Sequence, residues 1–151
     1  TANTIAARNS SGDIYASVFH GIATQAQYAD LAEKYTADKD YEPGTVLVFG
    51  GEEEVTECTV FCDSRLAGVV STEPAHLMND GIEGVAIALK GRVPCKVEGP
   101  VKKGDILVTG PIAGTATALR PDSATPSAWC VVGKSLVNDD EAGIRLIEVA
   151  V

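Results

Sequence analysis

Hydrophobic and polar residues alternate along much of the chain with a period of two, which is typical of half-buried β-strands. The clearest example is the stretch 91–108, in which Val93, Cys95 and Val97 fall on one side of a first strand and charged residues fall near the other. A tight reversal follows, where Gly104 supplies positive φ at low cost, and it leads into a second strand. The pattern therefore predicts a strand pair with a well-defined register.

From residue 41 onward, short apolar runs recur between turns that contain glycine, proline or acidic residues. They predict further strands over 45–49, 55–61, 66–71, 85–89, 115–119, 129–136 and 144–151. The run 45–49 is apolar at successive positions, so it predicts a strand that is buried on both faces. About nine or ten short strands at this spacing predict a mainly β fold, either a compact sandwich or a distorted barrel.

The first 24 residues follow a different pattern. The run 14–19 carries apolar side chains on both faces, and a strong turn signal over 9–13 precedes it. An isolated hairpin cannot bury two apolar faces. This segment is therefore expected either to pack on the main domain or to meet copies of itself in an oligomer.

One short helix is predicted over 24–35. Tyr28, Leu31, Ala32 and Tyr35 recur at the spacing i, i+3, i+4 and i+7, which places them on one helical face. A Thr-x-x-Gln pattern that resembles a capping box marks its start. Such a short helix must be held by packing, so it is either an ordinary surface helix or has its Tyr/Leu face against a symmetry mate.

These patterns divide the chain into a strand-rich segment over 1–24, a helical connector over 25–40 and a β-rich domain over 41–151. In the first two parts, several apolar side chains have no core of their own to enter. We expect them to form oligomer contacts: Ile14, Tyr15, Val18, Phe19, Tyr28, Leu31 and Tyr35.

Composition narrows the possible partners. The formal net charge is −9, which argues against nucleic acid as a partner, because phosphate binding requires a basic surface. No secretory signal and no apolar run of 18 residues is present, so neither export nor membrane insertion is predicted. Aromatic residues make up only 5% of the chain, and the core is therefore expected to consist of aliphatic side chains.

The four cysteines offer a weak metal signal. Cys58 and Cys62 have a spacing that zinc sites use, but Cys95 and Cys130 lie alone in apolar runs and no histidine has matching spacing. If 55–61 is a strand that extends slightly further, Cys58 and Cys62 face the same way and pack inward. We expect buried free thiols, with no metal and no other cofactor.

A nucleophilic set is formally present in Ser71, His76 and Asp80, which are close in sequence. It lacks the Gly-x-Ser-x-Gly elbow that exposes a catalytic serine in many hydrolases. No phosphate-binding loop and no dinucleotide fingerprint occurs either. The sequence therefore does not predict a conventional soluble enzyme, and no catalytic residue is assigned.

Two groups of segments resemble a known family. The opening stretch 7–16 resembles shaft segments of trimeric bacteriophage tail fibres. The stretches 28–33, 66–75, 90–108 and 144–149 resemble the C-terminal domains of phage tail fibres and neck appendages. Some members of that family are self-cleaving intramolecular chaperones that help the fibre to trimerise.

This resemblance implies a homotrimeric module of a virion tail fibre, made in the host cytoplasm and joined to an upstream shaft of the same chain. It would assist trimer assembly or contact a glycan or protein on the host surface. The loops 52–54, 72–81 and 121–127 are the candidate contacts, because of their length and polarity. The alternative is an intramolecular chaperone with autoproteolytic activity. Self-cleavage in the family requires a serine beside an acidic residue at the start of the domain, and no Ser-Asp dipeptide occurs in this chain.

Overall fold

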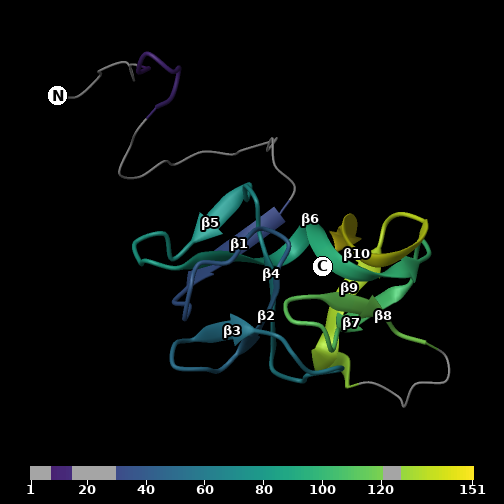
Figure 1. Cartoon of the computed structure of the whole chain (residues 1–151). Coiled ribbons are helices and arrows are strands. Elements are labelled where there is room, and N and C mark those ends of the chain that lie inside the picture. Colours follow the sequence, from purple (N-terminus) through teal and green to yellow (C-terminus); the bar gives the residue numbers. More distant parts are fainter. Residues whose placement is uncertain (1–7, 15–29, 121–126) are drawn as a thin grey trace.

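The computed structural model describes residues 8–14, 30–120 and 127–151. Within these ranges the protein is mainly β, as predicted, and it contains one short 3₁₀ helix (Figure 1). The elements are β1 (Asp30–Tyr35), β2 (Val46–Phe49), β3 (Val55–Glu57), β4 (Leu66–Val70), β5 (His76–Met78), β6 (Val85–Val101), β7 (Ile106–Thr109), β8 (Ala116–Ala118), the helix η1 (Ala128–Cys130), β9 (Val131–Ser135) and β10 (Asp139–Ala150).

Five strands close a small barrel. The C-terminal half of β6 (92–101) pairs with β10 on one side and with β8 on the other. β8 then pairs with β7, β7 with β9, and β9 with β10, which completes the ring. The β6–β8 pair is parallel and the other pairs are antiparallel. The predicted distorted barrel is therefore confirmed.

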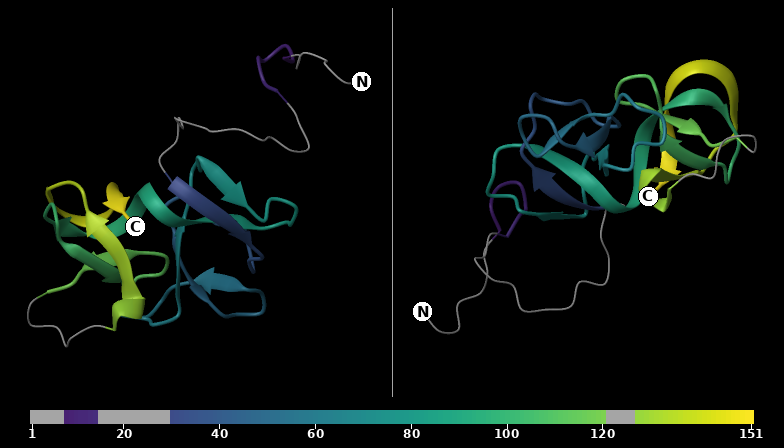
Figure 2. Two further views of the ribbon diagram at one scale, coloured as in Figure 1. Left: turned by 180° about the vertical axis from the view of Figure 1, so that it is seen from behind. Right: turned by 90° about the horizontal axis from the view of Figure 1, so that it is seen from below.

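A second, open sheet uses the N-terminal half of β6 (85–91), which pairs with β1 and β4. β5 extends this sheet beyond β1, and β2 and β3 extend it beyond β4. The long strand β6 thus runs through both regions, as the view from below in Figure 2 shows. Gly91, where the two parts of β6 meet, pairs with Asp30 and exchanges two backbone hydrogen bonds with Val151. The start of β1 and the end of the chain therefore meet at one point.

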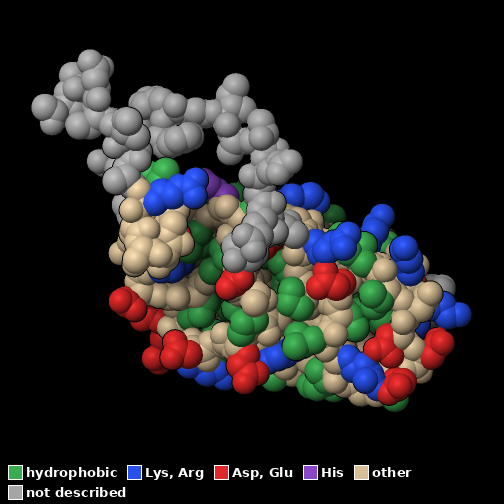
Figure 3. Space-filling model, turned by 90° about the horizontal axis from the view of Figure 1, so that it is seen from above, with side chains coloured by type: hydrophobic (Ala, Val, Ile, Leu, Met, Phe, Trp, Pro, Cys, Tyr) green, Lys and Arg blue, Asp and Glu red, His purple; other side chains and the backbone are tan. Residues whose placement is uncertain are grey.

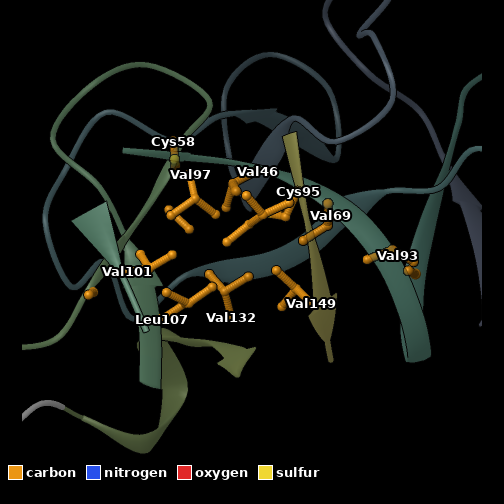
Figure 4. Close-up of a cluster of buried hydrophobic side chains, with 14 of the residues drawn as sticks. Val46, Cys58, Val69, Val93, Cys95, Val97, Val101, Leu107, Val132 and Val149 are labelled. Atoms are coloured by element: carbon orange, nitrogen blue, oxygen red, sulfur yellow. The ribbon is translucent and has the colours of Figure 1, made fainter. Parts of the chain in front are cut away.

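Two hydrophobic clusters fill the protein. The larger contains fifteen buried side chains from both sheets. Most of those drawn in Figure 4 point toward one another. The smaller lies under the open sheet and contains five buried side chains: Leu47, Val55, Val70, Val85 and Ile87. Val46 and Val48 enter the larger cluster while Leu47 enters the smaller one, so β2 is buried on both faces as predicted. Val93, Cys95 and Val97 also point inward as predicted.

The predicted helix over 24–35 is wrong where the structure describes it. Asp30–Tyr35 is the strand β1, which pairs antiparallel with β6 and parallel with β5. Burial alternates at the start of the segment, where Asp30 and Ala32 are buried and Leu31 is exposed. Pairing on both sides satisfies the backbone more completely than an isolated turn or two of helix can, since short helices are marginal alone. Residues 24–29, with Tyr28, lie outside the described ranges.

The strand pair predicted over 91–108 is correct in its strands and wrong in its pairing. A turn closed by the bond from the Asp105 N–H to the Lys102 carbonyl (2.9 Å) separates β6 from β7, and Gly104 has φ +92°. Within the described residues β8 lies between these two strands and pairs with each of them. The small side chains of Ala116 and Ala118 are buried there, which allows β8 to fit between its neighbours.

Candidate functional site

An apolar groove of about 270 Å³ lies where the open sheet meets the barrel. Its walls come from β4 and β6 on one side and from η1 and β9 on the other, and Val151 contributes to the lining. The side chains that line it are mainly Ala, Val and Leu, and charged residues are absent from its lining within the described part of the chain. The groove is smaller than a typical drug-sized pocket, so it suits one edge or one ring of a ligand.

Trp129 stands at the rim of this groove. It is 77% exposed, the highest fraction among the large hydrophobic side chains of the described residues, and it is the only tryptophan in the chain. Ser127 positions it: the Trp129 N–H donates to Ser127 Oγ (3.3 Å), and the Cys130 N–H donates to the Ser127 carbonyl (3.1 Å). These two bonds close a short turn that presents the indole to solvent.

Sequence reasoning placed Trp129 at the start of a strand and did not nominate it as a functional residue. The strand begins two residues later, at Val131. A local signal was available, because a serine that precedes a short helix is a typical N-cap. That signal predicts the turn but not the exposure of the indole, which depends on how η1 sits against the barrel.

A second, polar hollow of about 450 Å³ lies beside β1 and the start of β6. Asp40, Glu53 and Glu83 line it together with Lys39, whose ammonium group binds Glu57 at 3.2 Å. Glu53 belongs to the predicted contact loop 52–54, which is exposed. Among the described residues, no group of three or more His, Cys, Asp or Glu side chains could hold a metal ion.

Ser71, His76 and Asp80 do not form a catalytic set. Ser71 is buried, His76 is exposed on β5, and Asp80 forms an ion pair with Lys34 at 3.0 Å. In the part of the chain that the structure describes, no hydrogen bond joins any two of these three side chains. The hydroxyl of Ser71 is buried without a partner, so no base is placed to activate it.

No protein-family model and no curated protein matches the chain. The ligands that the groove could bind therefore follow from the side chains around it. An exposed indole offers a flat apolar face and one N–H donor, a combination enriched at interfaces. The indole of Trp129 can stack on a planar group of a ligand or on the C–H face of a sugar ring. The uncharged groove beside it can then hold an adjacent apolar part of the same ligand.

The four cysteines are free, as predicted, but they occupy different environments. Cys58, Cys95 and Cys130 are buried and Cys62 is half-buried. Burial raises the pKa of Cys58 to about 11, and burial also raises the pKa of Cys95. The prediction that Cys58 and Cys62 share a strand is wrong, because β3 ends at Glu57 and Cys62 lies in a loop with φ +54°.

The structure describes three of the seven predicted oligomer contacts. Ile14 and Leu31 are exposed, and Leu31 points outward from β1. Tyr35 packs within its own subunit: its ring meets Phe49 edge-on at 5.6 Å, and its hydroxyl donates to Glu33 at 2.8 Å. Burial, followed by this bond, raises the pKa of Tyr35 to about 12. Tyr15, Val18, Phe19 and Tyr28 lie outside the described residues.

Further exposed apolar side chains lie on the barrel. Ile144 and Leu146 occupy successive outward positions on β10 and are 51% and 60% exposed. A methyl group of Leu146 partly covers Gly44, and the outward neighbours on β6 are Glu98 and Lys96. On the face seen in Figure 3, hydrophobic and charged side chains are interspersed. Among the described residues, no helix is long and apolar enough to cross a bilayer.

Proposed function

We propose that this chain is a homotrimeric module at the C-terminal end of a phage tail fibre, which supports trimer assembly and contacts the host surface. The observation that carries this proposal is the apolar pair on β10. Ile144 and Leu146 project side by side from a strand whose inward side chains already fill the core. Burying each of them against another copy is worth roughly 1.5–3 kcal/mol, and a closed trimer gains this at three equivalent interfaces.

The arrangement of the ends supports a module that is attached on one side. The chain reaches β1 at Asp30, beside Gly91 and Val151. In Figures 1 and 2 (left), η1 and the turn between β2 and β3 lie at the end of the molecule away from this point. If a fibre shaft precedes Asp30, the η1 end of the groove, with Trp129, lies away from the shaft, while the groove extends back to Val151. A host glycan or protein is the ligand class that an exposed indole in this position favours.

Light scattering of the purified chain tests the assembly. The expected mass is three times 15.7 kDa. Leu146→Lys places a charge in the proposed contact and is expected to shift the mass toward 15.7 kDa. Ile112→Lys is the matched control, because Ile112 is also exposed but lies in the loop between β7 and β8. A monomeric wild-type chain at high concentration would overturn the proposal. Equal effects of the two variants would show that β10 does not form the interface.

A chain that begins at Asp30 separates the roles of the two parts. This boundary keeps β1, which the body requires because Ala32 is fully buried. If the chain 30–151 is still a trimer, the contacts that hold the trimer together lie in the β-rich body. A folded monomer would place them in residues 1–29, where five of the predicted contacts lie: Ile14, Tyr15, Val18, Phe19 and Tyr28.

A further inference from the structure

The loop between β3 and β4 and the turn η1 both lie against the end of β7. In the loop, the Cys62 N–H donates to the carbonyl of Thr109 (3.1 Å), and the Asp63 N–H donates to Thr109 Oγ1 (2.6 Å). In the barrel, β7 pairs antiparallel with β9, with Val108 opposite Val131. The same register brings Thr109 next to the residue that precedes Val131, which is Cys130. One residue of β7 therefore has Cys62 and Cys130 as neighbours.

The two thiols are close to each other. The Cys130 thiol is one of the neighbouring groups that raise the pKa of Cys62, which agrees with their shared neighbour Thr109. The Cys130 thiol donates to the Ser127 carbonyl at 3.0 Å. Backbone bonds hold both residues in place, since the Cys62 N–H bonds to Thr109 and the Cys130 N–H bonds to Ser127.

We propose that Cys62 and Cys130 are a modification site at which an intramolecular disulfide forms when the protein meets a low-molecular-weight disulfide. The Cys62 thiolate attacks one sulfur of an oxidant such as glutathione disulfide, forms a mixed disulfide and releases one glutathione thiolate. The Cys130 thiolate then attacks the Cys62 sulfur and releases the second glutathione. Two protein thiols lose two electrons and two protons, and one glutathione disulfide is reduced to two thiols.

The other two cysteines provide an internal contrast. Cys58 and Cys95 are fully buried in the larger hydrophobic cluster (Figure 4), where a charged, polar oxidant cannot reach them. Cys62 is only half-buried and begins the exchange. Cys62 also has a left-handed backbone, with φ +54°, which is uncommon for a residue other than glycine and marks a position that its surroundings hold in place.

The disulfide would join the loop of the open sheet to the barrel across a long stretch of sequence. A link of this kind restricts the unfolded chain and is expected to raise Tm by about 5–10 °C. It would also brace η1, because Cys130 follows Trp129 directly. The inference is independent of the proposed trimer, since both thiols belong to one chain.

The test uses the full chain with glutathione disulfide at about pH 8.5, followed by denaturation, alkylation with N-ethylmaleimide and mass spectrometry. Four adducts are expected before oxidation and two after it, with a peptide map that links Cys62 to Cys130. Burial and the neighbouring Cys130 thiol raise the pKa of Cys62 to about 11, so the rate should rise about tenfold for each pH unit below that value. The fluorescence of Trp129, the only tryptophan, should change as the link forms.

Cys62→Ser and Cys130→Ser should each abolish the intramolecular link, whereas Cys95→Ala should retain it. Oxidation of the wild-type chain is decisive even if a variant folds poorly. Four remaining adducts, a link between any other two cysteines, a link between chains, or a stable glutathione adduct on Cys62 without ring closure would each overturn the proposal.

Discussion

The closed barrel and the open sheet share one strand and differ in how their edges are satisfied. Every barrel strand pairs on both sides, so the ring has no free edge. Among the described residues, the open sheet ends in β3 and β5, which have three residues each. β5 pairs on one side only, and the outer edge of β3 makes a single bridge, between Val55 and Ala37. Short edge strands limit pairing with other chains. The barrel can therefore be stable alone, while the open sheet depends on it through β6.

The two hydrophobic clusters also differ in size. The larger has fifteen buried side chains, which lie between the barrel strands and the inner face of the open sheet, and the smaller has five. One region has complete pairing and a large core, and the other has sparsely paired edge strands and a small core. The second region is therefore expected to open locally first. Substitutions that change the same chemistry in each region test this comparison directly.

The largest expected effect comes from removing a buried leucine in each region. Leu107→Ala leaves a cavity inside the closed barrel, where the surrounding strands cannot move inward, and should lower the free energy of unfolding by about 3–5 kcal/mol. Leu47→Ala affects the smaller cluster, whose edge strands can relax, and should cost about 2–3 kcal/mol. Both side chains are fully buried, so the difference reports the surroundings. Urea unfolding measures it, and a larger loss for Leu47→Ala would reverse the comparison.

A smaller effect is expected from adding one methyl group between barrel strands. In β9, a Cβ on Gly133 would lie 2.3 Å from the carbonyl oxygen of Ala150 in β10. A closed ring cannot widen at one pair without disturbing the others, so Gly133→Ala should cost about 2 kcal/mol.

Gly81→Ala is the control for this variant. Gly81 lies in the connection before β6, and apart from its chain neighbours no residue comes within 4 Å of the place that an added methyl group would occupy. Its substitution should change stability by less than about 0.5 kcal/mol. Thermal unfolding of both variants separates the outcomes. If Gly133→Ala is as stable as Gly81→Ala, the barrel is more adaptable than a closed ring implies.

The strands of the barrel could be predicted from the sequence because burial there follows a simple alternation. Val93, Cys95 and Val97 show this, since each points inward from β6 and each was assigned from its position alone. The strand β1 differs from the prediction because Leu31, Ala32 and Tyr35 fit a helical face, whereas in the strand Ala32 is buried and Leu31 is exposed on the other side. The choice between them depends on β5 and β6, which arrive later in the chain.

The functional features were harder to predict because they depend on which strands become neighbours. Alternation shows that β6 and β7 are strands, but it does not show that β8 lies between them. The contact between Cys62 and Cys130 follows from the β7–β9 pairing and from the bonds of Thr109. The exposure of Trp129 likewise depends on where η1 sits. No local pattern shows which strands become neighbours. The spacing of the cysteines therefore indicates the pair Cys58 and Cys62, whereas the strand pairing brings Cys62 near Cys130.

The smallest expected effect concerns the loop that connects the two regions. Asp63 is 7% exposed and its carboxylate accepts two bonds from the Arg65 guanidinium, at 3.0 and 2.7 Å. This bonding lowers the pKa of Asp63 below its ordinary value. Because the folded pKa is the lower one, the stabilisation is present above the unfolded pKa of about 3.9 and is lost as the pH falls through the folded pKa. Since Arg65 is largely exposed, Asp63→Asn should cost only about 1 kcal/mol at about pH 7.

The difference in stability between the wild-type chain and Asp63→Asn should therefore be constant from about pH 5 to 8. It should shrink as the pH falls below the unfolded pKa of about 3.9 and disappear once the pH is below the folded pKa. Asp80→Asn is the matched control, since Asp80 pairs with Lys34 at 3.0 Å but its side chain is mostly exposed, and it should show almost no difference at any pH. Urea unfolding across this range measures both. If the difference for Asp63→Asn grows as the pH falls, the ion pair with Arg65 does not stabilise the loop. The bonds of the loop to Thr109 would then be its main attachment to the barrel.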